Sequence, residues 1–309
     1  MKENRIDRRR FLKSAALGAG AAWAVGARSE AAPAAGLNRL PPGKPVIFKA
    51  VQWSMIGEKL SIEDKFKLVR DLGFDGVEVD SPFGQDLKRL QEAAHAAGVQ
   101  IHGVVDPTHW NFRLSDPDPK IRERALQDLL KSIRCAHALG GWAVLLVPGH
   151  GKDGTQEEVA ERSLAQIQKA LPLAARLGVQ ILVENVWNNF CYVHNGPGDQ
   201  KADKLAAFID RAHSPWVGSY FDIGNHRRYA VPSQWVRTLG LRIRKLHAKD
   251  YNHKTRKWAD IGEGTVDWDQ VRNELARLNY HGWATAEVGG GDRKRLATIK
   301  RQMDAVFGG

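Results

Sequence analysis

Short apolar runs alternate with longer amphipathic segments from residue 46 to the end of the chain. Apolar runs of this length, bounded by turn residues, are typical of buried strands. We therefore expect strands at residues 46–51, 76–79, 100–105, 143–147, 180–184, 218–222, 245–248 and 284–288. The segments between them carry helical patterns, at residues 61–72, 85–97, 119–139, 155–177, 202–212, 268–278 and 293–306.

Local signals support this division into strand–helix units. Ser61, followed by acidic residues, is a typical helix start. Leu-Gly or Ala-Gly pairs at residues 72–73, 97–98, 139–140 and 177–178 are typical of helix ends. Eight such units in about 260 residues predict an α/β fold, a (β/α)8 TIM barrel. A doubly wound open sheet is the alternative, but no Gly-x-Gly-x-x-Gly turn follows the first strand, so nothing supports a dinucleotide site.

The first 45 residues have a different character. Residues 7–13 resemble the twin-arginine export signal, in which paired arginines precede a Phe-Leu-Lys element. The apolar stretch 15–25 is too short to span a bilayer, which takes about 20 residues, so we expect no stable membrane insertion. We interpret residues 1–31 as a signal peptide for the twin-arginine translocation machinery, 32–45 as a linker and 46–309 as the catalytic barrel. The mature protein is then expected to be periplasmic or extracytoplasmic.

Composition and charge narrow the class of protein. A hydrophobic share of 43% and a charged share of 26% are ordinary for a globular protein. The formal net charge is +11, of which residues 1–31, with seven Lys/Arg and three Asp/Glu, contribute +4. The remaining charges are interleaved along helical segments, which indicates a solvated surface and no nucleic-acid partner. Cys135 and Cys191 are the two cysteines, too few for a disulfide framework or a thiolate metal site.

Each of the last four predicted strands ends on a side chain that can bind a metal. In a barrel, the strand ends at the carboxyl face carry the chemistry, so these four side chains should converge. A buried carboxylate needs a partner, and a divalent cation would serve several at once. Three carboxylates and one imidazole suit one Mn²⁺, Mg²⁺, Co²⁺ or Zn²⁺ ion. Taken singly, each residue has an ordinary structural explanation, but the joint pattern favours a metal site. The residues are Glu184, Asp222, His247 and Glu287.

These strand ends resemble those of the xylose isomerase-like barrels of the sugar isomerase/epimerase superfamily, above all L-ribulose- and L-xylulose-5-phosphate 3-epimerases. The resemblance covers nearly the whole predicted barrel and is densest in Leu182-Val183-Glu184-Asn185, Phe221-Asp222-Ile223-Gly224-Asn225, His247-Ala248-Lys249-Asp250 and Gly262-Glu263-Gly264-Thr265-Val266-Asp267-Trp268, with Glu287 closing the set. It implies that Glu184, Asp222, His247 and Glu287 bind the metal and that Glu184 and Glu287 are the catalytic acid/base pair.

Such a site would perform proton transfer next to a sugar carbonyl. The carbonyl and its neighbouring hydroxyl would chelate the metal, which makes the adjacent C–H more acidic. One glutamate would remove the proton to give a metal-stabilised enediolate, and the other would return a proton to the opposite face or to the neighbouring carbon. The expected activity is therefore that of an epimerase or isomerase.

Further residues near the predicted strand ends are candidates for substrate contacts, and each has an ordinary structural alternative. The candidates are His102, His150, Asn185, Asn225, His226, Lys249 and His253. Glu78, which lies near the end of the second strand, is a weaker one. Trp110, Trp187 and Trp258 fall in loops after strands, where they could stack on sugar faces or pack in the core.

Two positions depart from the ketose 3-epimerase pattern, which leaves the reaction open. Asn225 stands where many of those enzymes have His, and His253 where they have Arg. Because sugar phosphates are cytoplasmic metabolites, an exported enzyme is expected to act on an unphosphorylated sugar. A lyase or hydratase for keto-sugars or 3-keto-glycosides is an alternative with the same metal site. A trinuclear-zinc nuclease lacks its extra ligands here, a non-catalytic sugar-binding protein stays open, and an oligomer is possible.

Overall fold

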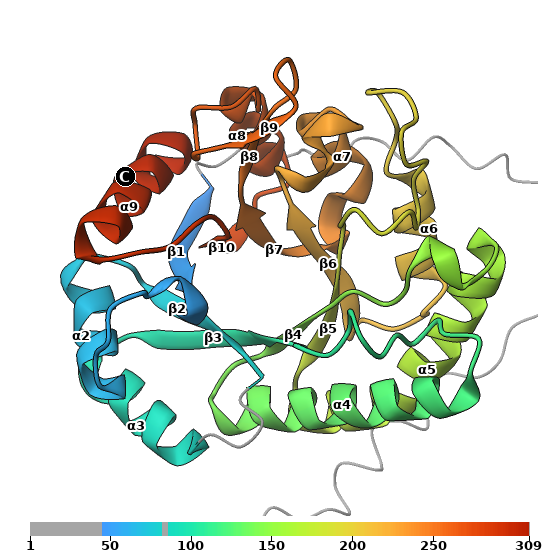
Figure 1. Ribbon diagram of the computed structural model, residues 1–309, viewed down its shortest axis with the longest axis horizontal. Coiled ribbons are helices and arrows are strands. Elements are labelled where there is room, and N and C mark those ends of the chain that lie inside the picture. Colours follow the sequence, from blue (N-terminus) through green and yellow to red (C-terminus); the bar gives the residue numbers. More distant parts are fainter. Residues whose placement is uncertain (1–44, 82–85, 309) are drawn as a thin grey trace, which may run out of the picture. The chain divides into compact units, whose positions relative to one another are not determined.

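A computed structural model describes residues 45–81 and 86–308. Eight parallel strands close into a barrel, and helices surround it (Figure 1). Around the barrel the strands are β1 (Val46–Gln52), β10 (His281–Ala286), β7 (Ile243–Ala248), β6 (Val217–Asp222), β5 (Gln180–Glu184), β4 (Ala143–Leu146), β3 (Gln100–Val105) and β2 (Gly76–Asp80). The predicted (β/α)8 barrel is confirmed, and the open sheet is excluded because β1 pairs with both β2 and β10.

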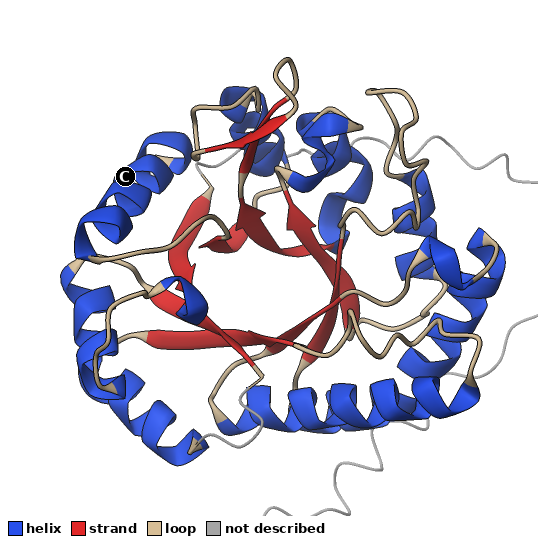
Figure 2. Cartoon of the chain, viewed as in Figure 1, coloured by secondary structure: helices blue, strands red, loops and turns tan. Residues whose placement is uncertain are grey.

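One helix follows each barrel strand, and together they form the outer ring (Figure 2). The helices are α2 (Ile62–Asp71), α3 (Leu87–Ala97), α4 (Pro119–Ala138), α5 (Gln156–Leu177), α6 (Asp203–Asp210), α7 (Pro232–Leu239), α8 (Trp268–Arg277) and α9 (Arg293–Phe307). None of the helices in the described ranges is long and apolar enough to cross a membrane. The predicted signal peptide and nearly all of the linker lie outside the described residues.

Helix ends follow the predicted signals. The Ser61 side chain accepts a hydrogen bond from Asp64 N at the start of α2. Gly98 and Gly178 close α3 and α5 with φ of 66° and 67°, which is the left-handed conformation that glycine adopts without strain. These glycine C-caps let α3 and α5 lead directly into the strands that follow them.

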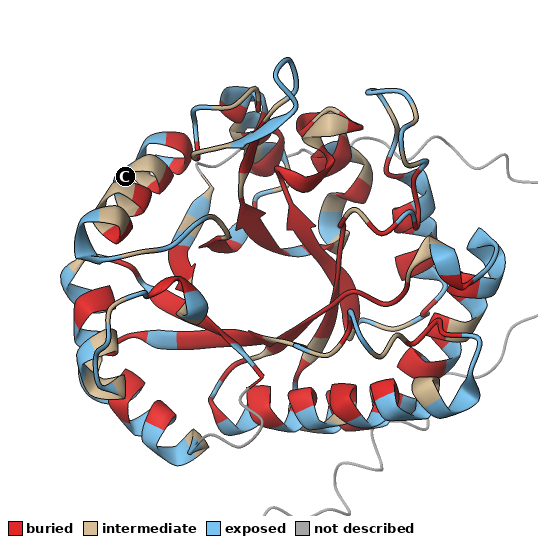
Figure 3. Cartoon of the chain, in the orientation of Figure 1, coloured by how far each residue is buried: buried red, intermediate tan, exposed pale blue. Residues whose placement is uncertain are grey.

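Most of the apolar core lies between the helices and the strands. Figure 3 shows the strands largely buried, whereas each helix has buried and exposed residues. A second, small apolar cluster lies inside the barrel and consists of Ala143, Leu145, Leu182 and Tyr220. Polar side chains fill the rest of the barrel interior, and some of them lie directly beneath the site.

Three elements differ from the expectations. The last strand is His281–Ala286 rather than 284–288, so Glu287 lies just beyond it. Helix α7 was not among the expected ranges, because Pro232 resembles a loop signal although it occupies the first helical turn. A two-stranded hairpin, β8 (Asp250–Asn252) and β9 (Lys257–Ala259), also projects after β7.

Candidate metal and sugar site

Four side chains with metal-binding atoms meet at the carboxyl end of the barrel. Glu184 and Asp222 are the last residues of β5 and β6, and Glu287 directly follows β10. His247 is next to last in β7 and pairs in register with Asp222. One potential ligand atom from each residue lies within 4.8 Å of the others. The structure therefore brings together the set that the sequence suggested.

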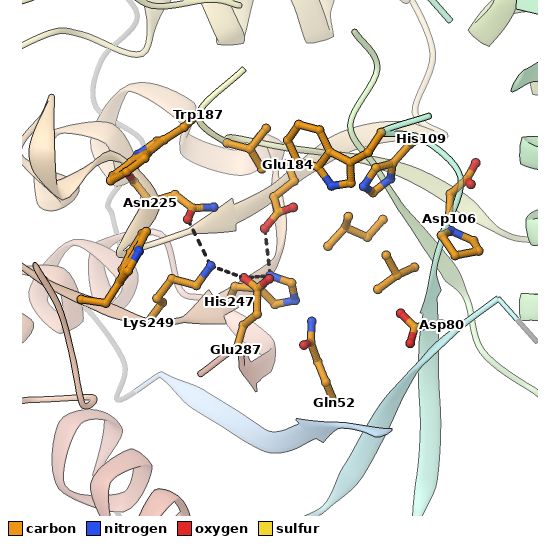
Figure 4. A pocket seen from close by; sticks show the side chains of 16 residues that line it. Gln52, Asp80, Asp106, His109, Glu184, Trp187, Asn225, His247, Lys249 and Glu287 are labelled. Carbon is orange, nitrogen blue, oxygen red and sulfur yellow. Dashed lines mark hydrogen bonds and ion pairs between the residues drawn. The ribbon is translucent and has the colours of Figure 1, made fainter. Parts of the chain in front are cut away.

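The imidazole of His247 lies between two glutamates (Figure 4). Its Nδ1 is 2.9 Å from Glu184 Oε1 and 3.1 Å from Glu287 Oε2. Its other nitrogen, Nε2, is 2.8 Å from Glu78 Oε2, deeper in the barrel. A hydrogen bond from Nε2–H to that carboxylate would leave the Nδ1 lone pair facing the cluster. This is the arrangement of a metal-binding histidine with an outer carboxylate partner.

The carboxylate of Asp222 shows that the cluster fits a cation. Its Oδ1 accepts hydrogen bonds from Gly224 N (2.8 Å) and Asn225 N (2.6 Å). Its Oδ2 is buried and accepts no hydrogen bond from the described residues, although Lys249 Nζ is 3.4 Å away. A buried carboxylate oxygen without a donor is costly. The oxygen is turned toward the other ligand atoms, where a divalent ion would satisfy it.

Burial and the charges of neighbouring groups shift the pKa values of the four residues in different directions. Burial, and then the charge of Glu287, raise the pKa of Glu184, and burial raises the pKa of Asp222 to about 7. The pKa of Glu287 is lowered, because the positive charges of His247 and Lys249 outweigh its burial. The pKa of His247 is raised well above its usual value, since the charges of Glu287 and Glu78 outweigh burial. Without metal, protons would neutralise this concentration of carboxylates.

Metal binding should therefore weaken in acid. A metal at His247 Nδ1 must displace the proton that the raised pKa keeps there, and below about pH 7 Asp222 holds a second proton. Both displacements become easier as pH rises, so the apparent Kd for Mn²⁺ should fall about tenfold per pH unit above pH 7 and more steeply below it. Calorimetric titrations between about pH 6 and pH 8 measure this slope. A Kd independent of pH would contradict the assignment.

A chain of hydrogen bonds continues from His247 into the barrel. Glu78 Oε1 accepts from Tyr220 OH at 2.7 Å, and Tyr220 OH is 3.1 Å from Thr285 Oγ1. Thr285 Oγ1 is in turn 3.1 Å from His102 Nε2. Every member is almost completely buried, so the chain holds Glu78, and through it the His247 ring, in one orientation.

Lys245 ends this chain at His102. Its ammonium group is 2.7 Å from His102 Nδ1 and 4.2 Å from the centroid of the Trp142 ring. Burial lowers the pKa of Lys245 to about 7. His102 is completely buried, is stacked on Trp283 and does not line the main cavity, so the structure gives no support to its predicted substrate contact. The residue is only the third of β3, too deep to reach the end of the strand.

Replacing Glu78 by Gln should weaken metal binding. The Gln amide can accept hydrogen bonds at its oxygen only, so it cannot accept from His247 Nε2–H and from Tyr220 OH at two separate atoms as Glu78 does. Changes of this kind typically cost 10- to 100-fold in metal affinity, and we expect about tenfold for Mn²⁺. Tyr220→Phe is the matched control, since it removes one donor and leaves the Glu78–His247 contact. Equal affinities of E78Q and the wild type would refute the role of Glu78.

The cluster opens into a cavity of about 560 Å³ at the barrel mouth. This size is within the usual range for small-molecule sites. Glu184, His247 and Glu287 line it, together with the predicted substrate residues Asn225 and Lys249. All three tryptophans predicted for the loops also line it, which are Trp110, Trp187 and Trp258.

Lys249 and the two asparagines hold the cluster in place. Lys249 Nζ is 2.7 Å from Glu287 Oε2 and 3.1 Å from Asn225 Oδ1. Asn185 is not among the residues lining the cavity. Its side chain accepts from Asp222 N (2.9 Å) and donates to Asp222 O (2.8 Å). Asn185 therefore fixes the backbone of Asp222, and the structure gives no support to its predicted substrate contact.

Three other predicted histidines do not line the cavity. His226 is buried and stacked on Trp235, and burial lowers its pKa to about 3. His150 accepts a hydrogen bond from Lys152 N at the start of a short 3-10 helix. His253 is in the turn between β8 and β9. The predictions of substrate contacts for these residues are not supported, because each belongs to the structure around the mouth.

The opposite wall of the cavity was missed by the sequence analysis. Gln52 and Asp80 end β1 and β2, and Asp106 follows β3. The strand-end rule that found the metal ligands would have found these three as well. His109 completes the wall, and its Nδ1 accepts from Val147 N at 3.4 Å. Burial lowers the pKa of His109 to about 3, so the neutral ring presents Nε2–H as a donor.

Comparison with known proteins agrees with the barrel fold. Residues 66–306 match the family described as the xylose isomerase-like TIM barrel. The chain belongs to this family. The putative L-ribulose-5-phosphate 3-epimerase SgbU of Escherichia coli (strain K12) is 27% identical over 253 residues, covering 74% of this chain and 83% of the relative. The L-ribulose-5-phosphate 3-epimerase UlaE of Escherichia coli (strain K12 / DH10B) is 24% identical over 233 residues, covering 71% and 79%.

Solved structures show the same fold. The 3-keto-D-glucoside 4-epimerase YcjR from E. coli superposes with a TM-score of 0.69 at 14% identity, covering 84% of this chain and 98% of that one. The D-psicose 3-epimerase from Clostridium cellulolyticum H10 superposes with a TM-score of 0.65 at 18% identity, covering 84% and 96%. At these identities the likeness supports the fold, and the chemistry must come from the site itself.

In this xylose isomerase-like barrel, Asp250 connects two segments that are far apart in the sequence, the end of the motif 247–250 and the loop 262–268. Its Oδ1 accepts from Tyr251 N and Val266 N, at 2.8 and 3.2 Å. Its Oδ2 accepts from Gly262 N and Trp268 Nε1, at 3.1 and 2.9 Å. The fully buried carboxylate thus ties the segment after β7 to the loop 262–268. Asp250 and the loop 262–268 therefore hold the wall of the site, next to His247 and Lys249, which line the cavity.

Proposed function

We propose that this chain is a divalent-metal-dependent epimerase or isomerase that acts on an unphosphorylated sugar. The observation that carries the proposal is the approach of Glu184 and Glu287 to His247 Nδ1 from two sides, at 2.9 and 3.1 Å, on the floor of the cavity. Two carboxylates around one bound carbon can exchange protons on both of its faces. The relatives and structures named above are epimerases, which favours this function over the lyase alternative.

A divalent ion held by Glu184, Asp222, His247 and Glu287 would act as a Lewis acid on the sugar carbonyl and the adjacent hydroxyl. The protein supplies the proton transfers. Glu184 and Glu287 form the acid/base pair, and the configuration of the sugar decides which of them removes the proton. For the opposite epimer the two roles reverse.

The proton and electron balance needs no other reagent. The base takes the proton from the carbon next to the carbonyl, and the C–H electron pair becomes part of an enediolate. The acid then donates its proton to the opposite face, so the carbonyl re-forms with inverted configuration. Both glutamates regain their starting protonation by exchange with water. Lys249, at 2.7 Å from Glu287 Oε2, holds that carboxylate in position throughout.

The charge of the cavity supports an unphosphorylated substrate. Asp80 and Asp106 line the wall opposite the metal ligands. Among the described residues that line it, Lys249 is the one Lys or Arg, and it is paired with Glu287. A phosphate dianion would find no free cation there and would face these carboxylates.

Solvent-deuterium incorporation tests the proposal. We expect the Mn²⁺-loaded protein in D₂O to label L-ribulose or D-psicose next to the carbonyl, and to yield the epimer rather than an eliminated sugar. L-ribulose 5-phosphate is the matched substrate, and we expect labelling at least about tenfold slower, because one unfavourable charge contact of about 1.4 kcal/mol suffices. Preference for the phosphate, or no labelling of any sugar by metal-loaded protein, would overturn the proposal.

We also propose that the protein is exported, on the strength of the twin-arginine sequence in residues 7–13. Replacing both Arg8 and Arg9, the pair that directly follows Asp7, by Lys should keep the protein in the cytoplasm of the producing bacterium. Fractionation followed by immunoblotting measures this. Unchanged export of the double variant would contradict the twin-arginine route.

A further inference from the structure

A second cavity of about 580 Å³ adjoins the metal site. It shares Lys249, Trp258 and Glu287 with the main cavity, so the two meet around the Trp258 side chain. The main cavity alone is already of a size that suits a small ligand. The second therefore offers room for a further part of the same ligand.

Trp258 is fixed in position and yet exposed. Its ring stacks on Trp187 with centroids 5.1 Å apart and meets Tyr251 edge-on at 5.2 Å. It is carried on β9, whose partner strand β8 begins at the anchored Asp250. Nevertheless Trp258 is 50% exposed, and Trp110 at the same mouth is 47% exposed. Large aromatic rings held rigidly in solvent at a cavity are characteristic of binding surfaces.

The far side of the second cavity is polar but neutral overall. Arg295 and Asp260 form a two-point ion pair there, with both N–O distances 2.7 Å. The guanidinium and carboxylate groups of this pair can form hydrogen bonds with hydroxyl groups. The pair has no net charge, so it does not favour a charged ligand. An aromatic face beside polar groups suits a pyranose ring, which has apolar C–H faces and hydroxyl edges.

We propose that the second cavity binds a second sugar ring, and that the substrate is a neutral keto-sugar carrying a pyranose in glycosidic linkage. The inference rests on the proposed function for the reacting ring. Because Glu287 lines both cavities, the glycosidic bond lies close to the reacting carbon. Trp258 stacks on the second ring, and the Arg295–Asp260 pair meets its hydroxyls.

Gly289 offers a way to close the second cavity without removing any contact. It lines this cavity, and a Cβ built there meets no atom within 4 Å. Gly289→Phe should therefore place a ring in the open space where the second sugar would lie. Trp258→Ala instead removes the stacking surface. Leu241→Ala is the control, since Leu241 is 75% exposed just before β7, at the opposite end of the barrel.

The test compares D-fructose with lactulose, which is D-fructose carrying a galactopyranose on O4. Deuterium incorporation at C3 gives kcat/KM for both sugars with Mg²⁺-loaded protein. We expect the lactulose-to-fructose ratio of kcat/KM to fall at least about tenfold in G289F and W258A, as loss of one stacked ring implies. It should not change in L241A. Equal ratios in all four proteins would overturn the inference.

A binding measurement separates this inference from the proposed function. Saturation-transfer NMR should detect contact between the wild-type protein and the galactose protons of lactulose, and G289F should abolish it. If neither sugar exchanges but that contact is seen and is lost in G289F, the subsite stands and the proposed chemistry fails. If fructose exchanges but the galactose ring makes no contact, the chemistry stands and the subsite is refuted.

Discussion

Glu184→Gln is expected to abolish epimerisation while the protein stays folded and can still be saturated with metal. The amide keeps an oxygen for the metal but cannot carry a proton back and forth. Loss of a positioned acid or base costs about 10² to 10⁴ in rate, and we expect about 10³-fold in kcat for interconversion. The rate is measured by NMR at saturating Mn²⁺ with both epimers as starting sugars.

Glu287→Gln is the matched variant, and the pair of variants gives a sharper result than either alone. Each should retain deuterium exchange with at most one epimer, namely the one whose C–H faces the remaining glutamate. The two variants should retain exchange with opposite epimers. If both still interconvert the epimers within about tenfold of the wild-type rate, the two-glutamate mechanism is wrong.

Asp250→Ala should cause the largest loss of stability. The carboxylate is fully buried and accepts four hydrogen bonds, so its removal leaves four donors without this partner, three of them in buried bonds. Each such donor costs about 1–3 kcal/mol, and allowing for relaxation we expect the free energy of unfolding to fall by about 4 kcal/mol or more. Urea unfolding followed by circular dichroism measures the change.

The control for this stability prediction is Asp269→Ala. Asp269 forms an ion pair with Arg272, but its side chain is 79% exposed. Exposed ion pairs contribute little, so the change should be within about 0.5 kcal/mol. Comparable losses for both aspartates would contradict the view that burial of Asp250 makes it important. Gly264 belongs to the same argument, because any side chain there would collide with the Asp250 carboxylate.

The sequence predicted the barrel because its strands and helices differ in length and pattern in all units except the one that contains α7. It also predicted the metal cluster, because a parallel barrel necessarily brings strand ends together. For this reason the sequence alone was enough to place Asp222 and His247 next to each other at the ends of β6 and β7. The glycines after α3 and α5 were equally predictable, since a left-handed helix end requires them.

The depth of a side chain inside the barrel was not predictable. The pairing of β2 with β3 shifts between Val77 and Glu78, and that of β6 with β7 shifts between Ser219 and Tyr220. Such shifts move side chains along the barrel axis and leave no mark in the apolar pattern. Glu78 was consequently considered for substrate contact, whereas it supports His247 from below.

Other omissions have simpler causes. Asp80 and Asp106 were not predicted, although they lie at the ends of the second and third strands, where the same strand-end rule applies. The hairpin that carries Trp258 was missed because its two strands have only three residues each, too few for a pattern. Trp258 therefore appeared as a loop residue, and the second cavity beside it could not be foreseen.

The most direct test of the account is anomalous diffraction from crystals of the Mn²⁺-loaded protein. We expect one strong manganese peak with His247 Nδ1 and oxygens of Glu184, Asp222 and Glu287 at about 2.0–2.2 Å. Glu78 should stay hydrogen-bonded to His247 Nε2. A peak elsewhere, or no peak at saturating Mn²⁺, would contradict the central claim that these four residues form a metal centre.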